Sequence, residues 1–429
     1  MPLGMVQRTL RSLNGSLYLN AIYLMANTAA NQILGIVFWF FAARLYSTSD
    51  VGVAATIMTS LGFLAGLANL GLSTGLIRFL PEAKEKTKVM INSCVTISGL
   101  AGLILAASFL AGLDVWAQSL SRIRAEPIFL LSFILLGGIL SIGFTADSVL
   151  VSHRRSHLVL WKQAFYGLRV PLVLIFAYFV GSFGVFGSWA LASILATMAG
   201  LFLFIPRVVA NYRPAISVEK SVVKKLIRFS LANHVAGIIS AIPAGLTPLL
   251  ISNILTTENA AYFYLAFTLS GVLTAVPGAM ATSLFAEGSQ PSSNFVRDTR
   301  KALKFSALLL SLGIAVFWFF GGFLLGIFGR HYSDAGLDLL RLLAISSVFV
   351  AINLTYQTKA MVEKNMRVII GLAILTSTLA LGLSYALLLS YGILAVGIAQ
   401  LISQGITSIV VIFLWRPRWI FSRFHKSSG

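Results

Sequence analysis

The chain has 429 residues, of which 58% are hydrophobic and only 10% are charged. Soluble domains carry about 25% charged residues, so this composition excludes a water-soluble globule and a disordered chain. The formal net charge of +19 does not indicate nucleic-acid binding, because the basic residues flank long apolar runs and do not cluster on one soluble module.

Twelve apolar runs follow one another along the chain, and each is long enough for a helix to cross roughly 30 Å of hydrocarbon. The runs do not alternate apolar and polar residues, as the strands of an outer-membrane barrel do. We therefore expect an all-α, polytopic membrane protein with twelve transmembrane helices. These helices are predicted at 18–43, 51–77, 89–112, 128–151, 160–180, 184–205, 229–254, 260–285, 305–328, 337–358, 368–389 and 393–415.

Lys and Arg are distributed unequally between the two ends of the predicted helices. The two termini and the even-numbered loops hold 26 of these residues, whereas the odd-numbered loops hold 5. Cytoplasmic loops of membrane proteins are enriched in Lys and Arg. We therefore predict a multi-pass protein of the cell membrane with both termini in the cytoplasm.

Helices of the two halves of the chain begin at matching positions, offset by 208 or 209 residues. Six helices per half is an even number, so both halves cross the membrane in the same direction as a parallel repeat. This pattern predicts two six-helix bundles around a central cavity. The matching helices begin at 51, 128, 160 and 184 in the first half and at 260, 337, 368 and 393 in the second.

The repeat divides the chain into an N-terminal bundle at 1–206, a basic cytoplasmic linker at 207–228 and a C-terminal bundle at 229–429. The linker carries six basic residues, and its apolar positions fall on one face of a helix. Two interpretations are open. The linker is either a short helix in the cytoplasmic membrane interface or a solvated segment that follows the positive-inside rule.

Polar side chains lie at helical spacing on several predicted helices. They either line a water-filled cavity or hold the helices together by hydrogen bonds. The histidine among them is either a titrating group or a structural residue with a satisfied ring. These candidates are Asn27 and Asn31 on the first helix, Asn69 on the second, His234 on the seventh, and Gln400 and Gln404 on the twelfth.

Charges within a membrane helix are functional candidates by default. Asp147 and Arg169 lie within the fourth and fifth helices, and we expect them at comparable depth in a structural ion pair. The alternative is that Arg169 faces the cavity and binds an anionic ligand. Arg44 and Arg78 end the first and second helices, where they either snorkel to the interface or form the rim of the ligand path.

Several classes of chemistry have no support in the sequence. The single cysteine, Cys94, cannot form a disulfide within the chain, and the histidines are not spaced as metal ligands. There is no Walker A motif and no Ser, His and Asp arrangement on a sizeable loop. We therefore expect no metal, no cofactor and no enzymatic activity.

Two stretches of sequence resemble a known family. Residues 38–52 (FWFFAARLYSTSDVG) and 71–82 (GLSTGLIRFLPE) resemble the ends of the first two helices in polysaccharide transporters. These are the Wzx-like flippase branch of the multidrug/oligosaccharidyl-lipid/polysaccharide superfamily. The resemblance implies two lobes with a cavity between them, and transfer of polyprenyl-linked oligosaccharide to the outer leaflet by alternating access.

The expected function is therefore a flippase or exporter of polyprenyl-(pyro)phosphate-linked oligosaccharide. Its expected partners are that ligand, membrane lipids and a coupling ion, either a proton or sodium, and no nucleic acid. Two alternatives stay open, namely a multidrug exporter of the same superfamily and a membrane glycosyltransferase or polysaccharide ligase.

Overall fold

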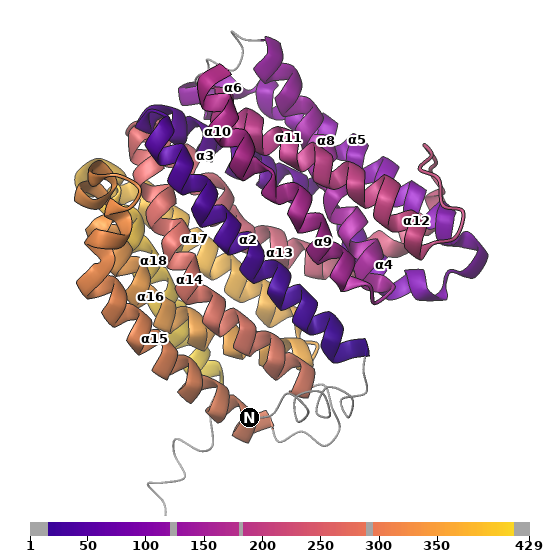
Figure 1. Ribbon diagram of the computed structural model, residues 1–429. Helices are drawn as coiled ribbons and strands as arrows, with labels where there is room; N and C mark the ends of the chain where they lie inside the picture. The colour runs from indigo at the N-terminus through magenta and orange to yellow at the C-terminus, as the bar shows by residue number, and fades with distance from the viewer. Residues whose placement is uncertain (1–15, 121–126, 180–182, 289–294, 416–429) are drawn as a thin grey trace, which may run out of the picture. The chain divides into compact units, whose positions relative to one another are not determined.

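The structure is a computed structural model that describes residues 16–120, 127–179, 183–288 and 295–415. Every regular element within these ranges is a helix (Figure 1). Twelve helical segments among the described residues are long and apolar enough to cross a membrane. The predicted all-α, twelve-span fold is confirmed.

The chain forms two compact units, Met1–Ala261 and Tyr262–Gly429. In chain order the long helices of the first unit begin with α2 and end with α13, and α14 starts in the first unit and continues into the second. The helices are α2 (Ser16–Leu45), α3 (Thr48–Ala68), α4 (Leu72–Phe79), α5 (Thr87–Ala111), α6 (Leu113–Trp116), α8 (Pro127–Ser152), α9 (Ser156–Gly167), α10 (Arg169–Phe179), α11 (Gly184–Met198), α12 (Ile205–Val208), α13 (Lys220–Ile254), α14 (Thr257–Gly288), α15 (Phe295–Gly326), α16 (Arg330–Val362), α17 (Met366–Tyr391) and α18 (Leu394–Trp415).

Short elements complete the fold. A π-helical segment, Ala199–Phe204, joins α11 to α12 within one membrane span, and 3₁₀ turns occur at Leu80–Glu82, Lys84–Lys86 and Gln118–Leu120.

The second predicted helix is broken between α3 and α4. Leu70 and Gly71 have φ angles of 53° and 76°, a left-handed conformation that ends an α-helix. The side-chain oxygen of Asn69 accepts a hydrogen bond from the Ser73 amide at 3.1 Å and so caps α4. A Cβ atom at Gly71 would approach that of Ser230 to 2.9 Å, so the break also lets α13 pack closely.

The fifth predicted helix is divided into α9 and α10 at Leu168. Pro171 has no amide hydrogen and cannot bond to the carbonyl of Gly167, which explains why the helix is interrupted there. The two segments together form one membrane span, Ser156–Tyr178. The first residue of α10 is Arg169, so the interruption lies next to a predicted site residue.

The end of the predicted linker is part of the seventh span. Residues 220–228 form the first turns of α13, and Val222, Val223 and Leu226 are buried in the core of the first unit. A separate interfacial helix is therefore the wrong interpretation for these residues, because their apolar face packs on protein. The solvated linker is also wrong for this face, although Lys220 and Lys224 on the opposite face are exposed.

Contacts place α13 with the first unit, where it packs against α3 and α4. The division of the chain at 206 and 229, which rests on the sequence repeat, stays a prediction. In the second unit, α15 packs against α16, and α18 packs against both α16 and α17.

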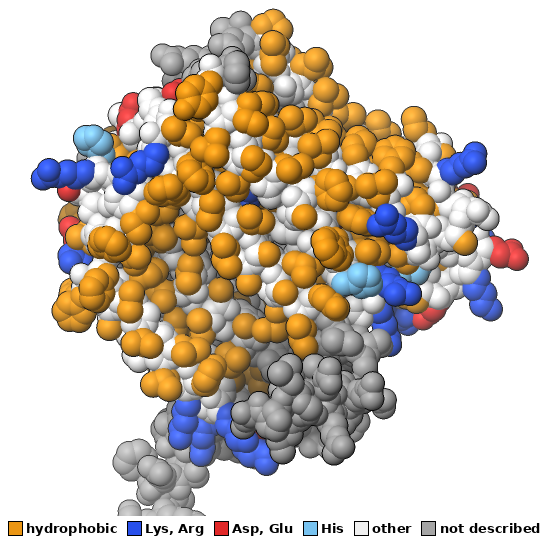
Figure 2. All heavy atoms as spheres, in the orientation of Figure 1, with side chains coloured by type: hydrophobic (Ala, Val, Ile, Leu, Met, Phe, Trp, Pro, Cys, Tyr) orange, Lys and Arg blue, Asp and Glu red, His pale blue; other side chains and the backbone are white. Residues whose placement is uncertain are grey.

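Large apolar side chains are exposed along the helices. On α15, Leu308, Leu312 and Phe319 have exposed fractions of 66%, 65% and 79%. Figure 2 shows hydrophobic side chains over most of the visible face, with Lys and Arg side chains near its edges. Such a surface is unfavourable in water and suits the hydrocarbon of a bilayer.

Helices α5 and α8 pack closely against each other and run side by side in Figure 1. A Cβ atom at Gly102 would come within 2.2 Å of the carbonyl oxygen of Gly137. The backbone of α8 cannot move aside as easily as a flexible side chain. We therefore expect Gly102→Ala to push the two helices apart and to lower the free energy of unfolding by about 1–3 kcal/mol. The thermal unfolding midpoint of the purified protein should fall.

Gly371 on α17 is the matched control, because no heavy atom lies within 4 Å of a Cβ atom built there. Gly371→Ala should leave the midpoint unchanged or raise it slightly, since alanine favours a helix. Equal midpoints for the two variants would contradict the close packing of α5 and α8.

Candidate functional site

Arg169 is the most deeply buried charged residue among those described, with only 5% of its surface exposed. Its guanidinium donates hydrogen bonds to the backbone oxygen and the side-chain oxygen of Asn31, at 3.3 Å each. The same group stacks on the ring of Tyr166, 4.1 Å from the centroid, and lies 5.6 Å from that of Phe38. The cation is therefore held by neutral oxygens and by aromatic faces.

No carboxylate among the described residues lies within ion-pair distance of Arg169. Its Nε–H is buried and has no hydrogen-bond partner there. An unpaired buried cation is costly, because desolvation is not offset by an opposite charge. The arrangement consequently favours an anion that approaches Arg169.

The predicted ion pair between Asp147 and Arg169 is wrong. Asp147 on α8 instead contacts Lys162 on α9, with Oδ1 and Nζ 2.5 Å apart. Asp147 lies five residues before the end of α8 and Lys162 six residues after the start of α9, so both are about 8–9 Å along their helices from the turn that joins them. Arg169, thirteen residues after that start, lies roughly 20 Å away, which is too deep for Asp147.

A second set of hydrogen bonds joins the neighbours of Arg169. The amide of Gln163 donates to the side-chain oxygen of Asn31 at 3.0 Å, and the indole of Trp189 donates to the hydroxyl of Tyr166 at 2.6 Å. We call Asn31, Gln163, Tyr166 and Arg169 the Arg169 cluster. It is built by α2, α9 and α10, and α2 packs against both of the others (Figure 1).

The cluster is buried at Arg169 and Gln163 but reaches the surface of the first unit at Asn31, which is exposed. One turn earlier on α2, Asn27 has a buried side-chain oxygen without a partner among the described residues. The polar face predicted for the first helix therefore contains one residue that hydrogen-bonds to neighbouring helices, Asn31, and one with an unused acceptor, Asn27.

Two other predicted residues lie at the break between α3 and α4. The Asn69 amide nitrogen donates to the hydroxyl of Thr145 at 3.3 Å, in addition to the cap that its oxygen provides. His234 on α13 packs beside Gly71, and its Nε2 is buried without a partner among the described residues. These contacts favour a structural role for Asn69.

The predicted residues at helix ends and on the last helix are separate from the Arg169 cluster. Arg44 is exposed at the end of α2. Arg78 is exposed on α4 and pairs with Glu82, 2.5 Å away. On α18, the side-chain oxygen of Gln404 accepts a hydrogen bond from the Asn353 amide at 2.7 Å, whereas Gln400 is half-buried one turn earlier.

The structure thus brings Asn31 and Arg169 together and adds Gln163 and Tyr166 to them, while Lys162 pairs with Asp147. None of these three added residues was predicted as a site residue. Lys162, Tyr166 and Arg169 follow one another at spacings of four and three, so they share one face of a helix. That spacing was readable in the sequence. It was missed because Lys162, which lies inside the predicted helix 160–180 and inside the span Ser156–Tyr178, was counted with the basic residues of the cytoplasmic loop.

The fold is shared with solved membrane transporters. The lipid II flippase MurJ, in an inward closed conformation, superposes with a TM-score of 0.74 at 15% identity and covers 92% of this chain and 87% of its own. A multidrug resistance MATE family transporter of the MOP superfamily, in an inward-facing conformation, gives 0.69 at 16% identity, covering 93% and 96%. The outward-facing conformation of a MATE family transporter gives 0.62 at 14% identity, covering 93% and 94%.

These similarities show that the fold is shared, and they show the fold alone, because identities this low do not carry function. No curated protein matches the chain. A family described as polysaccharide biosynthesis protein matches residues 41–336, which is more than half of the sequence. The chain therefore belongs to this polysaccharide biosynthesis family, with the fold of MOP-superfamily transporters.

Proposed function

We propose that the protein is a transporter, and not an enzyme, that moves a polyprenyl-(pyro)phosphate-linked oligosaccharide from the cytoplasmic to the outer leaflet of the cell membrane. Alternating exposure of its polar site to the two sides of the membrane would drive the transfer. Membership of a polysaccharide biosynthesis family supports this class of cargo, and the fold of a lipid II flippase supports movement of a lipid-linked ligand.

The single observation that carries the proposal is Arg169. It is a buried guanidinium without a carboxylate partner among the described residues, and its cluster opens to the surface at Asn31. Arginine is suited to phosphate because its planar fork donates two hydrogen bonds at once. An anionic headgroup would supply the opposite charge that this site lacks.

Asn31 of the cluster and the neighbouring Asn27 suit the hydroxyl groups of a sugar. Each hydroxyl that enters hydrocarbon without a partner costs several kcal/mol. Asn31 and the unused acceptor of Asn27 lie one helical turn apart and can replace part of that lost hydration. A polar wall of this kind lets the head cross the bilayer while the polyprenyl tail stays in lipid.

Arg169→Gln tests the anion site directly. Glutamine keeps a donor for Asn31 but removes the charge, and hydrogen bonds to charged groups contribute about 1.5–3 kcal/mol. We expect transport of lipid-linked oligosaccharide into proteoliposomes to slow by roughly 10- to 100-fold, with Arg169→Lys intermediate. Transport is measured as protection of the labelled headgroup from an added glycosidase.

The matched control is Arg341→Gln. Arg341 also stacks on an aromatic ring, that of Trp318, but it already pairs with Asp338 at 3.2 Å. This variant should transport at the normal rate. Normal transport by well-folded Arg169→Gln would refute the anion site, and movement of lipophilic cations by the purified protein would favour the multidrug exporter.

The Asp147–Lys162 pair is the candidate for the coupling ion, because Asp147 is a membrane-embedded acid beside a cation. Its side chains are only 31% and 12% exposed. Asp147→Asn or Lys162→Met alone should therefore leave one buried charge and destabilise the protein by roughly 1–3 kcal/mol. The double variant should regain most of the loss in a thermal unfolding assay.

If the pair also couples transport to an ion, the double variant should fold but lose the dependence of transport on a proton or sodium gradient. Arg330 and Asp334, an exposed pair 3.8 Å apart, provide the control. Removal of either of these charges should change stability by less than about 1 kcal/mol. Additive losses for Asp147 and Lys162 would contradict a direct pair.

We further propose that both termini lie in the cytoplasm. Ala335 and Glu363 are exposed at opposite ends of α16. In a Cys94→Ala background, a cysteine at Ala335 should react in intact cells with a thiol reagent that cannot cross the membrane, and a cysteine at Glu363 should react only after lysis. Labelling of the Glu363 position in intact cells would reverse the orientation.

A further inference from the structure

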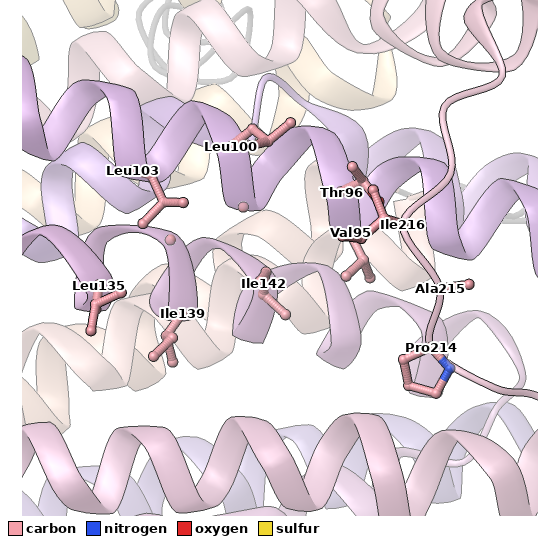
Figure 3. A pocket seen from close by; sticks show the side chains of 12 residues that line it. Val95, Thr96, Leu100, Leu103, Leu135, Ile139, Ile142, Pro214, Ala215 and Ile216 are labelled. Carbon is pink, nitrogen blue, oxygen red and sulfur yellow. The ribbon is translucent and has the colours of Figure 1, made fainter.

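An apolar groove of about 400 Å³ lies in the first unit between α5 and α8, and Figure 3 shows the side chains that line it. It is separate from the Arg169 cluster, which α2, α9 and α10 build. Thr96 is the one hydroxyl-bearing residue of its lining, and its side-chain oxygen is occupied by the Ser217 amide at 3.2 Å. Its lining comes from α5, α8 and the chain segment 214–216.

Glycines bring the two helices together at the floor of the groove. A Cβ atom at Gly138 would meet the carbonyl oxygen of Gly99 at 3.0 Å, and one at Gly99 would meet the side chain of Ile142 at 2.9 Å. Leu100 and Leu135 stand at the rims and are about half exposed. The result is a narrow channel with an apolar floor and apolar walls, which fits a hydrocarbon chain.

The chain segment 213–219, which we call the strap, closes the cytoplasmic end of the groove. The side-chain amide of Asn92 donates to the carbonyl of Arg213 at 3.2 Å, and the amide of Glu219 donates to the hydroxyl of Ser93 at 2.9 Å. The strap is thus tied to α5 by polar bonds. Ile216 in its centre is nevertheless 94% exposed, which is unfavourable unless lipid covers it.

The depth of the groove matches one leaflet. The polar residues Asn92 and Ser93 mark the interface on α5, and the lining from Val95 to Leu103 extends roughly 4–16 Å beyond Asn92. Half of a 30 Å hydrocarbon core is about 15 Å. A chain in the groove would therefore belong to a lipid of the cytoplasmic leaflet.

Positive charge surrounds the mouth. Arg213 on the strap and Lys220 just after it are exposed, and Lys88 is exposed on α5 one turn before Asn92. Glu219 is the one acidic residue of the strap. Three cations against one anion attract a negative headgroup at the interface.

We propose that this groove and strap form a binding site for an anionic phospholipid of the cytoplasmic leaflet. One acyl chain occupies the groove between α5 and α8, and the phosphate lies at Arg213, near Lys88 and Lys220. The bound lipid covers Ile216 and stabilises the strap, which leads directly into α13. The proposal does not depend on which ligand the protein transports.

Native mass spectrometry of the full-length protein tests the site after removal of co-purified lipid. The probes are phosphatidylglycerol and phosphatidylcholine with identical acyl chains. We expect one phosphatidylglycerol to be retained preferentially. Leu100→Trp and Leu135→Trp should each fill the groove and reduce retention at least 10-fold, whereas Leu131→Trp, exposed one turn away on α8 and outside the lining, should not.

The headgroup is tested separately with Arg213→Gln. One basic residue near an anionic headgroup is worth about 1 kcal/mol, so retention should weaken about five-fold. Arg367→Gln, an exposed arginine on the predicted cytoplasmic side of the second unit, should have no effect. Thermal unfolding of each variant verifies that it is folded.

Three results would overturn the proposal. They are equal retention of the two phospholipids, unchanged phosphatidylglycerol binding in both groove-filling variants, and displacement of phosphatidylglycerol by an equal concentration of polyprenyl phosphate. The last result would assign the groove to the tail of a polyprenyl-linked ligand instead.

Discussion

Hydrocarbon offers no hydrogen bonds, so every polar group within the membrane must find its partner inside the protein. This constraint explains why the described chain is helical and why its two helix breaks carry side chains suited to them. Asn69 caps the segment that follows the first break, and Arg169 at the second bonds the backbone oxygen of Asn31. Irregular backbone at membrane depth is tolerated only where protein or water satisfies it, so these breaks mark the polar regions of the first unit.

The same constraint distinguishes polar groups that bond to one another within the protein from polar groups that are free to bind a ligand. Asn69, Thr145 and Ser98 satisfy one another between α3, α5 and α8, and Asn353 with Gln404 does the same in the second unit. Such bonds hold helices together at modest gain, typically below 2 kcal/mol each. Arg169 differs, because no carboxylate among the described residues lies within ion-pair distance of its guanidinium. A group left in that state is expensive to keep in lipid and is therefore informative about the ligand.

The span number, the fold class and the approximate helix bounds followed from the sequence, because hydropathy over twenty residues averages out local detail. The breaks at Gly71 and Leu168 did not, although Asn69-Leu70-Gly71 and Pro171 carry suitable signals, since apolar runs continue through both. The partner of Asp147 depended on depth measured along two helices. Lys162 lies inside the predicted helix 160–180, but it was counted with the basic residues of the neighbouring loop because it is close to the cytoplasmic end of that helix. Val222 and Leu226 are buried against protein. An amphipathic pattern predicts that an apolar face is covered, but it does not specify whether protein or lipid covers it.

The charged residues of the first unit have no charged counterparts at the matching positions of the sequence repeat. At the offset of 208 or 209 residues, Asp147 corresponds to Tyr356, Lys162 to Ile370 and Arg169 to Ser377. The helices were retained in both halves, whereas the charges occur in one. An ionisable group in the membrane costs several kcal/mol and must be balanced by its own partners, so a second copy would double that cost without extending the apolar scaffold that the helices provide. The duplicated fold thus separates two requirements, since helix packing is met in both halves of the chain and the charged side chains occur at these positions in one.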